Sequence, residues 1–146
     1  MNKIIMTIID NQNLCKLLYY NSNTPLLEGD ITNTHSLIMN NIYPFPIVPD
    51  IEEDAKNIIT IILDDFRSSN SEYKTSKIVF NILCHIDLWS ISGGLRPLSI
   101  LNEIDRLFNQ QRIATIGKLD FVSTRWITAN KNWQGYQVAY KVTEFN

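Results

Sequence analysis

The chain has 146 residues, of which 45% are hydrophobic and 19% are charged, and its formal net charge is −2. This composition is typical of one globular domain, residues 1–146, and it excludes an intrinsically disordered chain. The slightly acidic balance gives no overall electrostatic footprint for nucleic acid, although it leaves room for a local basic patch.

The two cysteines, Cys15 and Cys84, lie far apart and in no metal-ligand spacing. We therefore expect two buried, reduced thiols, with no disulfide framework, no zinc site and no cofactor. The apolar run at the start closes at Asp10, which is too short for a membrane-spanning helix, and no cleavage site of small residues follows. We expect a protein without an export signal or a membrane partner.

Residues 11–20 are predicted to form a helix. Leu14, Leu17 and Leu18 fall on one stripe at helical spacing. Asp10 or Asn11 supplies a side chain that can cap the first turn.

Residues 21–50 predict an extended arm. Prolines interrupt this stretch and exclude regular structure around residues 43–50. The arm is nevertheless rich in apolar side chains, Tyr43 and Phe45 among them, so it is expected to pack on something. A structureless loop of this length is unusual inside a compact domain, which leaves a neighbouring subunit as an alternative support.

Residues 57–146 predict an α+β core. Residues 57–66 are a β-branched run typical of a central strand, and residues 67–76 are a polar loop. Residues 77–91 alternate with period two and predict a long, half-buried strand that the glycines at 93–94 end. The apolar positions of this strand are Ile78, Phe80, Ile82, Cys84, Ile86 and Leu88.

The remainder of the core is predicted as a helix and a strand pair. Residues 97–111 carry an apolar stripe behind Pro97, which suits a first helical turn, and the helix should lie across the sheet. Residues 118–128 and 134–145 alternate like strands, and residues 129–134 form the hairpin loop between them. The fold class is thus α+β: a mainly antiparallel sheet with an amphipathic helix on one face, plus the N-terminal helix and arm.

Three groups of residues are candidate chemical sites. His85 and Asp87 lie two apart on the predicted strand, which is the spacing of a general-base dyad, but no nucleophile shares their face. The acids at 52–54 and 64–65 suit a hard metal, yet adjacent strand residues point apart, so a solvated strand end is favoured. Arg96 at the helix start can bind an anion or hold a turn. No catalytic or metal site is predicted.

The predicted hairpin combines aromatic and basic residues. Such side chains stack single-stranded nucleic acid, and they also concentrate binding energy at protein interfaces. With an acidic chain the interface interpretation is favoured. The candidate subunit or partner interface comprises Tyr43, Phe45, Arg96, Arg125, Trp126, Lys131 and Trp133.

The order of elements from Lys77 onward resembles the tail-terminator and tail-completion (head–tail joining, neck) proteins of tailed bacteriophages. The resemblance is carried by Lys77–Trp89, Arg96–Phe108, Gly117–Phe121 and the Gly-Tyr run of Gly135–Val142, about half of the chain. In that family a long strand is followed by a helix on the sheet and then by a strand pair. The helix and arm over residues 11–50 also look like those of small phage neck proteins.

The resemblance implies a structural virion protein without enzymatic activity. Such proteins form rings, as hexamers or dodecamers, at the neck or the head-proximal tail end. They terminate the tail, join it to the capsid connector and contact tail-tube proteins. Genome DNA passes through the lumen without sequence readout. The implied location is the virion, and the host cytoplasm during assembly.

Two alternatives from other classes remain open. A single-stranded nucleic-acid-binding module would use Arg125, Trp126 and Trp133 of the hairpin, and its binding would weaken with salt. A small hydrolase would use His85 and Asp87.

Overall fold

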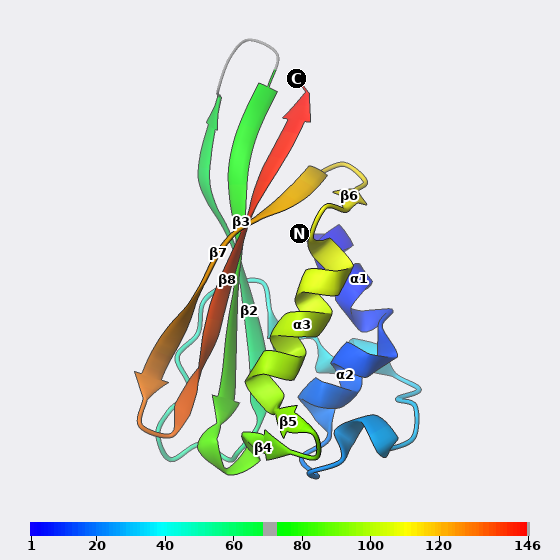
Figure 1. Ribbon diagram of the computed structural model, residues 1–146, viewed down its shortest axis with the longest axis vertical. Coiled ribbons are helices and arrows are strands. Elements are labelled where there is room, and N and C mark those ends of the chain that lie inside the picture. Colours follow the sequence, from blue (N-terminus) through cyan, green and yellow to red (C-terminus); the bar gives the residue numbers. More distant parts are fainter. Residues whose placement is uncertain (69–72, 146) are drawn as a thin grey trace.

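The computed structural model describes residues 1–68 and 73–145 and shows an α+β fold (Figure 1). Its described strands form one sheet in the order β1-β2-β3-β8-β7-β6, together with a separate β4-β5 hairpin. The neighbours from β2 through β7 are antiparallel, and the short β1 is parallel to β2. The fold class predicted from the sequence is confirmed.

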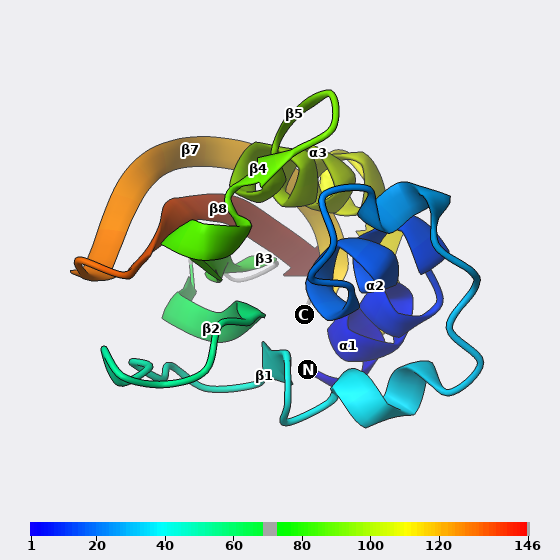
Figure 2. The ribbon, with the colours of Figure 1, turned by 90° about the horizontal axis from the view of Figure 1, so that it is seen from below.

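Four long strands make up most of the sheet, and they are joined into two hairpins. The strands of the molecule are β1 (Ile42–Tyr43), β2 (Asn57–Ser68), β3 (Tyr73–His85), β4 (Ser90–Ile91), β5 (Gly94–Leu95), β6 (Arg112–Ile113), β7 (Gly117–Asn130) and β8 (Trp133–Phe145). The sheet is strongly coiled, as long antiparallel ribbons are (Figures 1 and 2).

The three described α-helices lie on one face of the sheet (Figures 1 and 2). They are α1 (Asn2–Ile9), α2 (Gln12–Tyr19) and α3 (Arg96–Phe108). Asn11 caps α2, since its side-chain oxygen accepts a 2.8 Å hydrogen bond from the Leu14 backbone N–H. We call the face under the helices the inner face and the opposite one the outer face.

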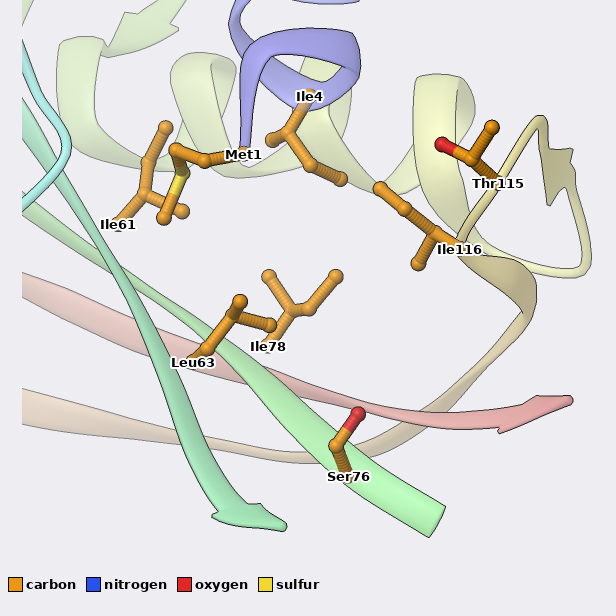
Figure 3. A pocket seen from close by; sticks show the side chains of 8 residues that line it. All are labelled: Met1, Ile4, Ile61, Leu63, Ser76, Ile78, Thr115 and Ile116. Carbon is orange, nitrogen blue, oxygen red and sulfur yellow. The ribbon is translucent and has the colours of Figure 1, made fainter. Parts of the chain in front are cut away.

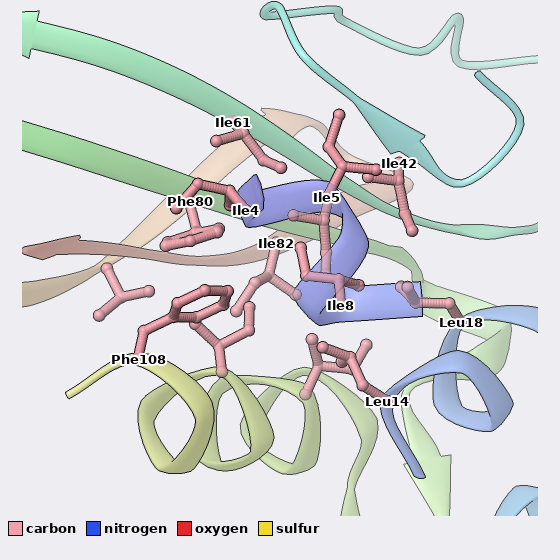
Figure 4. Close-up of a cluster of buried hydrophobic side chains, with 14 of the residues drawn as sticks. Ile4, Ile5, Ile8, Leu14, Leu18, Ile42, Ile61, Phe80, Ile82 and Phe108 are labelled. Atoms are coloured by element: carbon pink, nitrogen blue, oxygen red, sulfur yellow. The ribbon is translucent and has the colours of Figure 1, made fainter. Parts of the chain in front are cut away.

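The core lies between the inner face and the helices (Figure 4). Phe80 from β3 stacks on Phe108 from α3 with ring centroids 5.1 Å apart, and Tyr140 from β8 meets Phe80 edge-on. The Tyr140 hydroxyl donates a 2.8 Å hydrogen bond to Asp105 of α3, which satisfies its polar end at the edge of the core. The period-two pattern of β3 therefore fixes which face the helices cover.

Gly135 is required by close packing within the sheet. It pairs with Leu83 of β3 and with Ile127 of β7. A β-carbon built on Gly135 would lie 1.8 Å from the Ile82 carbonyl oxygen. No side chain fits at that distance, so the coiling of the central strands depends on glycine here.

The structure corrects several predicted boundaries. The strand predicted over 77–91 ends at His85, and Ile86–Leu88 form a 3₁₀ turn. Both ends of the loop predicted over 67–76 belong to strands, because β2 runs to Ser68 and β3 begins at Tyr73, and its middle, residues 69–72, lies outside the described residues. The hairpin loop predicted at 129–134 shrinks likewise, since Asn130 pairs with Trp133. No helix was predicted before residue 11, yet Asn2–Ile9 form α1, whose four buried isoleucines recur at helical spacing.

The arm packs on its own chain. After two short 3₁₀ turns and β1, it passes along the outer face of the sheet (Figure 2). Pro46, Ile47 and Val48 line a shallow pocket there with residues of β2, β3, β7 and β8. Side chains near the hairpin tip then hold the arm, as Asn130 donates to the Pro49 carbonyl and Asn132 to the Ile51 carbonyl. Packing within the molecule thus accounts for part of the apolar content of the arm, whereas Leu27, Phe45 and Val48 remain exposed.

Candidate interaction surface

The Nδ1 atom of His85 lies 3.6 Å from a carboxylate oxygen of Asp87, but the Asp87 side chain is 75% exposed, so the pair lacks the sheltered hydrogen bond of a general-base dyad. His85 ends β3 and is 8% exposed, whereas Asp87 follows in the 3₁₀ turn. The Nδ1 atom of His85 accepts a 3.1 Å hydrogen bond from the Asp87 backbone N–H. The imidazole ring packs edge-on against Trp133, with centroids 5.2 Å apart. The histidine is held as part of the packing, and its Nδ1 acts as a hydrogen-bond acceptor.

The two cysteines and the acidic residues are the other candidates for chemistry. Cys15 and Cys84 are free and fully buried, and burial raises the pKa of each thiol to about 12. These thiols are unsuited to nucleophilic chemistry near neutral pH. Within the described residues no group of three or more His, Cys, Asp and Glu side chains could hold a metal ion. The side chain of Asp65, one of the predicted acids, lies outside the described part.

Arg96 is a buried clamp, which corrects its prediction as an interface residue. It is 0% exposed at the first position of α3. Its guanidinium donates to three backbone carbonyls, those of Leu88 at 2.8 Å, Leu17 at 2.7 Å and Ser22 at 2.8 Å. Burial lowers the pKa of Arg96. The planar fork therefore joins α2, α3 and the turn after β3, and it leaves no donor surface for a partner.

Trp133 is likewise removed from the candidate interface. It begins β8 and is 0% exposed. It pairs with His85 across the sheet, so both rings occupy the outer face where the arm passes. Its size and hydrophobicity stabilise the hairpin end of the fold, and the ring cannot reach a partner.

Trp126 remains as an exposed aromatic side chain, and it lies on the inner face. It is 51% exposed and pairs with Tyr136. Its ring packs edge-on against Tyr136, with centroids 5.5 Å apart, and at a tilt against Trp89, with centroids 5.3 Å apart. Its indole N–H donates to the Thr128 hydroxyl. We call Trp89, Trp126 and Tyr136 the aromatic surface. The neighbouring rings hold Trp126 in place while leaving half of it accessible, as at protein interfaces.

The basic residues of the hairpin lie apart from this surface. Arg125 precedes Trp126 on β7 and so points to the outer face, where it donates to Gln137 at 2.9 Å. Gln137 in turn donates to Asn81, which extends the polar row across the sheet. Lys131 is exposed at the hairpin tip. The structure therefore separates Arg125 and Trp126 between the two faces.

A second exposed aromatic pair lies at the opposite edge of the sheet. Tyr43 of β1 meets Phe45 edge-on at 6.0 Å, and Phe45 is 42% exposed. The ammonium of Lys56 lies 5.7 Å from the centre of the Tyr43 ring and 3.3 Å from its hydroxyl. Strands β2, β3 and β8 separate this pair from β7.

Sequence reasoning missed the partners that complete these surfaces. Trp89 was assigned to the end of a strand, but the turn at Ile86–Leu88 directs it toward Trp126. Lys56, which directly precedes β2, was also given no role. The apolar alternation of Cys84, Ile86 and Leu88 continues through this turn, so the sequence carries no signal for the placement of Trp89, and it carries none for Lys56.

Comparison with known proteins identifies the family. No curated protein matches the chain. Among the described residues no helix has both the length and the apolar character needed to cross a membrane. The model of the YomW family matches residues 11–142, which span α2, the arm, α3 and nearly all of the sheet. The chain belongs to the YomW family.

Proposed function

We propose that this protein is a structural virion protein of a tailed bacteriophage. It forms a ring at the neck or at the head-proximal end of the tail, terminates the tail and joins it to the capsid connector. The assembly role places it in the virion and, before that, in the host cytoplasm. Genome DNA passes through the ring, and the protein acts without enzymatic activity.

The element order supports the proposal. The resemblance to tail-terminator proteins rests on a long strand, a helix across the sheet and a strand pair that ends in a Gly-Tyr run. The structure has that order as β3, α3, β7 and β8, and Gly135 stands at a point where a side chain cannot fit. The support is fold-level analogy, so the surface must carry the functional argument.

The observation that carries the proposal is the placement of exposed aromatic side chains. Trp126 is 51% exposed on β7, and Phe45 is 42% exposed beside β1, at the other edge of the sheet. Aromatic side chains of this kind concentrate the energy of protein–protein contacts. A subunit of a ring needs contact surfaces on two opposite sides, because each copy meets two neighbours.

The experiment is to measure assembly and partner binding together. The mass of the purified chain in solution is determined alone and with the connector and tail-tube proteins encoded by the same genome. The proposal expects a ring, hexameric or dodecameric, either in free solution or on one of these partners. A chain that remains monomeric and binds neither partner would refute it.

The second candidate, binding of single-stranded nucleic acid, keeps one favourable observation. Trp126 is exposed and Lys131 lies at the nearby hairpin tip. Against it, Trp133 is buried and Arg125 points to the other face, so these residues form no continuous stacking platform. Titration of a single-stranded oligonucleotide at low salt decides the matter, since this candidate requires binding that salt weakens.

A further inference from the structure

One edge of the sheet is open along β7. The short β6 pairs only with Gly117 and Lys118, and backbone bonds from Gln110 and Gln111 reach Leu119. Beyond Phe121, no strand of the described chain lies on that side of β7 (Figure 1). All residues from 121 to 126 are exposed. An open edge of this kind presents unpaired backbone donors and acceptors to solvent.

The exposed part of the β7 edge contains a stretch of strand without a bulge. Register shifts occur at Phe121/Ser123 and at Thr128/Asn130, and between them the residues of Ser123–Thr128 pair one to one with β8. The segment reads Ser-Thr-Arg-Trp-Ile-Thr, rich in strand formers and free of proline and glycine. Arg125 is its one charge, where protected edges usually carry lysine, proline or a bulge within the strand.

The other edge of the sheet is open along β2. The two residues of β1 pair with Ile59 and Thr60 only, so β2 continues past Thr60 without a described neighbour on that side. Leu63 there is 49% exposed on the inner face. It borders a cavity of about 220 Å³ with mostly apolar walls, which Ile61, Ile78 and Ile116 help to form (Figure 3).

We propose that β7 of one copy adds to the open edge of β2 in a second copy. The strands β2, β3, β8 and β7 alternate strictly in direction. A second copy placed head to tail therefore continues the alternation, and its β2 lies antiparallel to β7. The choice of a second copy as the occupant rests on the proposed ring, and the inference names the surface through which that ring closes.

The two edges match on both faces. Thr124 and Trp126 of β7 share the inner face, as do Ile61 and Leu63 of β2, so pairing extends one apolar layer toward the cavity. On the outer face Arg125 of one copy approaches Asp64 of the other, and their charges are opposite. Half-exposed apolar side chains on both edges, Trp126 and Leu63, would become buried together.

The open segments lie toward opposite ends of the subunit. Both β7 and β2 are open in their C-terminal parts, and the two strands run in opposite directions. Pairing them displaces successive copies along the strand direction. Such a displacement closes into a ring when the strands tilt relative to the ring axis, as in β-barrels. A head-to-tail contact of this type makes a ring where the rotation between copies closes, whereas a contact of β7 with β7 would make a two-fold dimer.

The first test blocks the edge without disturbing the fold. The backbone groups of Leu119 point away from β8, since they bond to Gln110 and Gln111. Alternate residues of a strand point their backbone groups the same way, and with the register shift at Phe121/Ser123 the N–H of Thr124 also points away from β8. Thr124→Pro therefore removes a donor that bonds only to an added strand, and proline is tolerated at such edge positions. Trp126→Lys places a charge in the same contact. Leu27→Lys, at an 85% exposed position, is the matched control.

Self-association is measured by sedimentation, and folding by circular dichroism and thermal unfolding. We expect both edge variants to remain folded and to weaken self-association at least about tenfold, as loss of one or two backbone hydrogen bonds would. Leu27→Lys should associate like the wild type. If the wild type forms rings and folded edge variants do so equally well, the inference is wrong, while the proposed function stands.

The second test identifies the pairing partner. Single variants Leu63→Cys and Thr124→Cys are mixed and treated with a short bismaleimide crosslinker; the native thiols are buried. The inference requires crosslinks between the two variants and few within Thr124→Cys alone. Efficient Thr124–Thr124 crosslinking would replace it with a two-fold contact. A wild type that stays monomeric at millimolar concentration also overturns it, and the proposed function is then judged by connector and tail-tube binding.

Discussion

At the scale of single residues, residue type alone predicted some partner contacts at positions that the fold buries. Arg96 and Trp133 are residue types that concentrate at interfaces, yet both are fully buried. The sequence could not show this, because Arg96 bonds to α2 and Trp133 packs on His85 of β3, and both partners are distant in the chain. By contrast, Trp126 was predicted as a contact residue from the same pattern, and it is exposed beside two other rings.

Gly135 gives the sharpest residue-scale prediction for stability. Gly135→Ala places a β-carbon 1.8 Å from the Ile82 carbonyl oxygen, so the central strands must separate. We expect the free energy of unfolding to fall by about 3 kcal/mol or more, as strained packing and lost ladder bonds add. Chemical denaturation measures it. Gly94→Ala is the control, since a β-carbon there meets no atom within 4 Å; equal stabilities of the two variants would contradict the packing argument.

The buried thiols predict a dependence of stability on alkaline pH. Burial raises the pKa of Cys15 and Cys84 to about 12 in the folded chain, whereas unfolded cysteine titrates near pH 8.5. Above about pH 8.5 the unfolded chain binds fewer protons than the native chain, so raising the pH favours unfolding. The contribution of the thiols to stability should be constant below that pH and fall by up to about 1.4 kcal/mol per pH unit for each thiol above it.

Urea unfolding between pH 8 and 11 measures this dependence. Cys84→Ala removes one titrating group and should reduce the contribution of the thiols to the slope by about half. A stability that stays flat over this range would show that the thiols ionise in the folded chain, contrary to their burial.

At the scale of elements, hydrophobic periodicity predicted the helices and strands that form the core. Helices α2 and α3 and strands β3, β7 and β8 were predicted because each presents one apolar face to the same core. The wrong boundaries lie in segments whose structure depends on hydrogen bonds to a neighbouring strand and not on their own residue pattern. Residues of the polar loop predicted over 67–76 extend β2 and β3, because the hairpin continues beyond the core. The short β1 has no pattern of its own and forms through its bonds to β2.

The hydrogen bonds of Arg96 connect several elements, and their contribution to stability can be tested. Arg96→Lys keeps the charge but cannot reproduce a fork that donates to carbonyls of α2, of the turn after β3 and of Ser22. We expect Arg96→Lys to lower the free energy of unfolding by about 2 kcal/mol and Arg96→Ala by about 3 kcal/mol or more, since buried carbonyls lose their donors. Chemical denaturation gives both values.

Arg106→Ala is the matched control. The Arg106 side chain is 63% exposed and pairs with Glu103 on the same helix, so its removal should change stability by no more than about 0.5 kcal/mol. If Arg96→Ala were equally mild, the buried guanidinium would not be the joint between these elements.

At the scale of the whole molecule, the fold places contact surfaces on opposite sides of one sheet. Trp126 and the open edge of β7 lie at one side, and Phe45, Leu63 and the open edge of β2 at the other. The α+β class and the exposed tryptophan could be predicted from the sequence. The two open edges could not, because the strand order, and so the identity of the edge strands, is a property of the assembled sheet.

The most direct measurement of the proposed function is negative-stain imaging of the purified chain mixed with polymerising tail tubes. The account predicts a ring at one end of each tube and an arrest of elongation when the ring is present. The same images with the connector added should show the ring between connector and tube. Tubes that elongate unchanged, with bare ends and no ring on the connector, would contradict it.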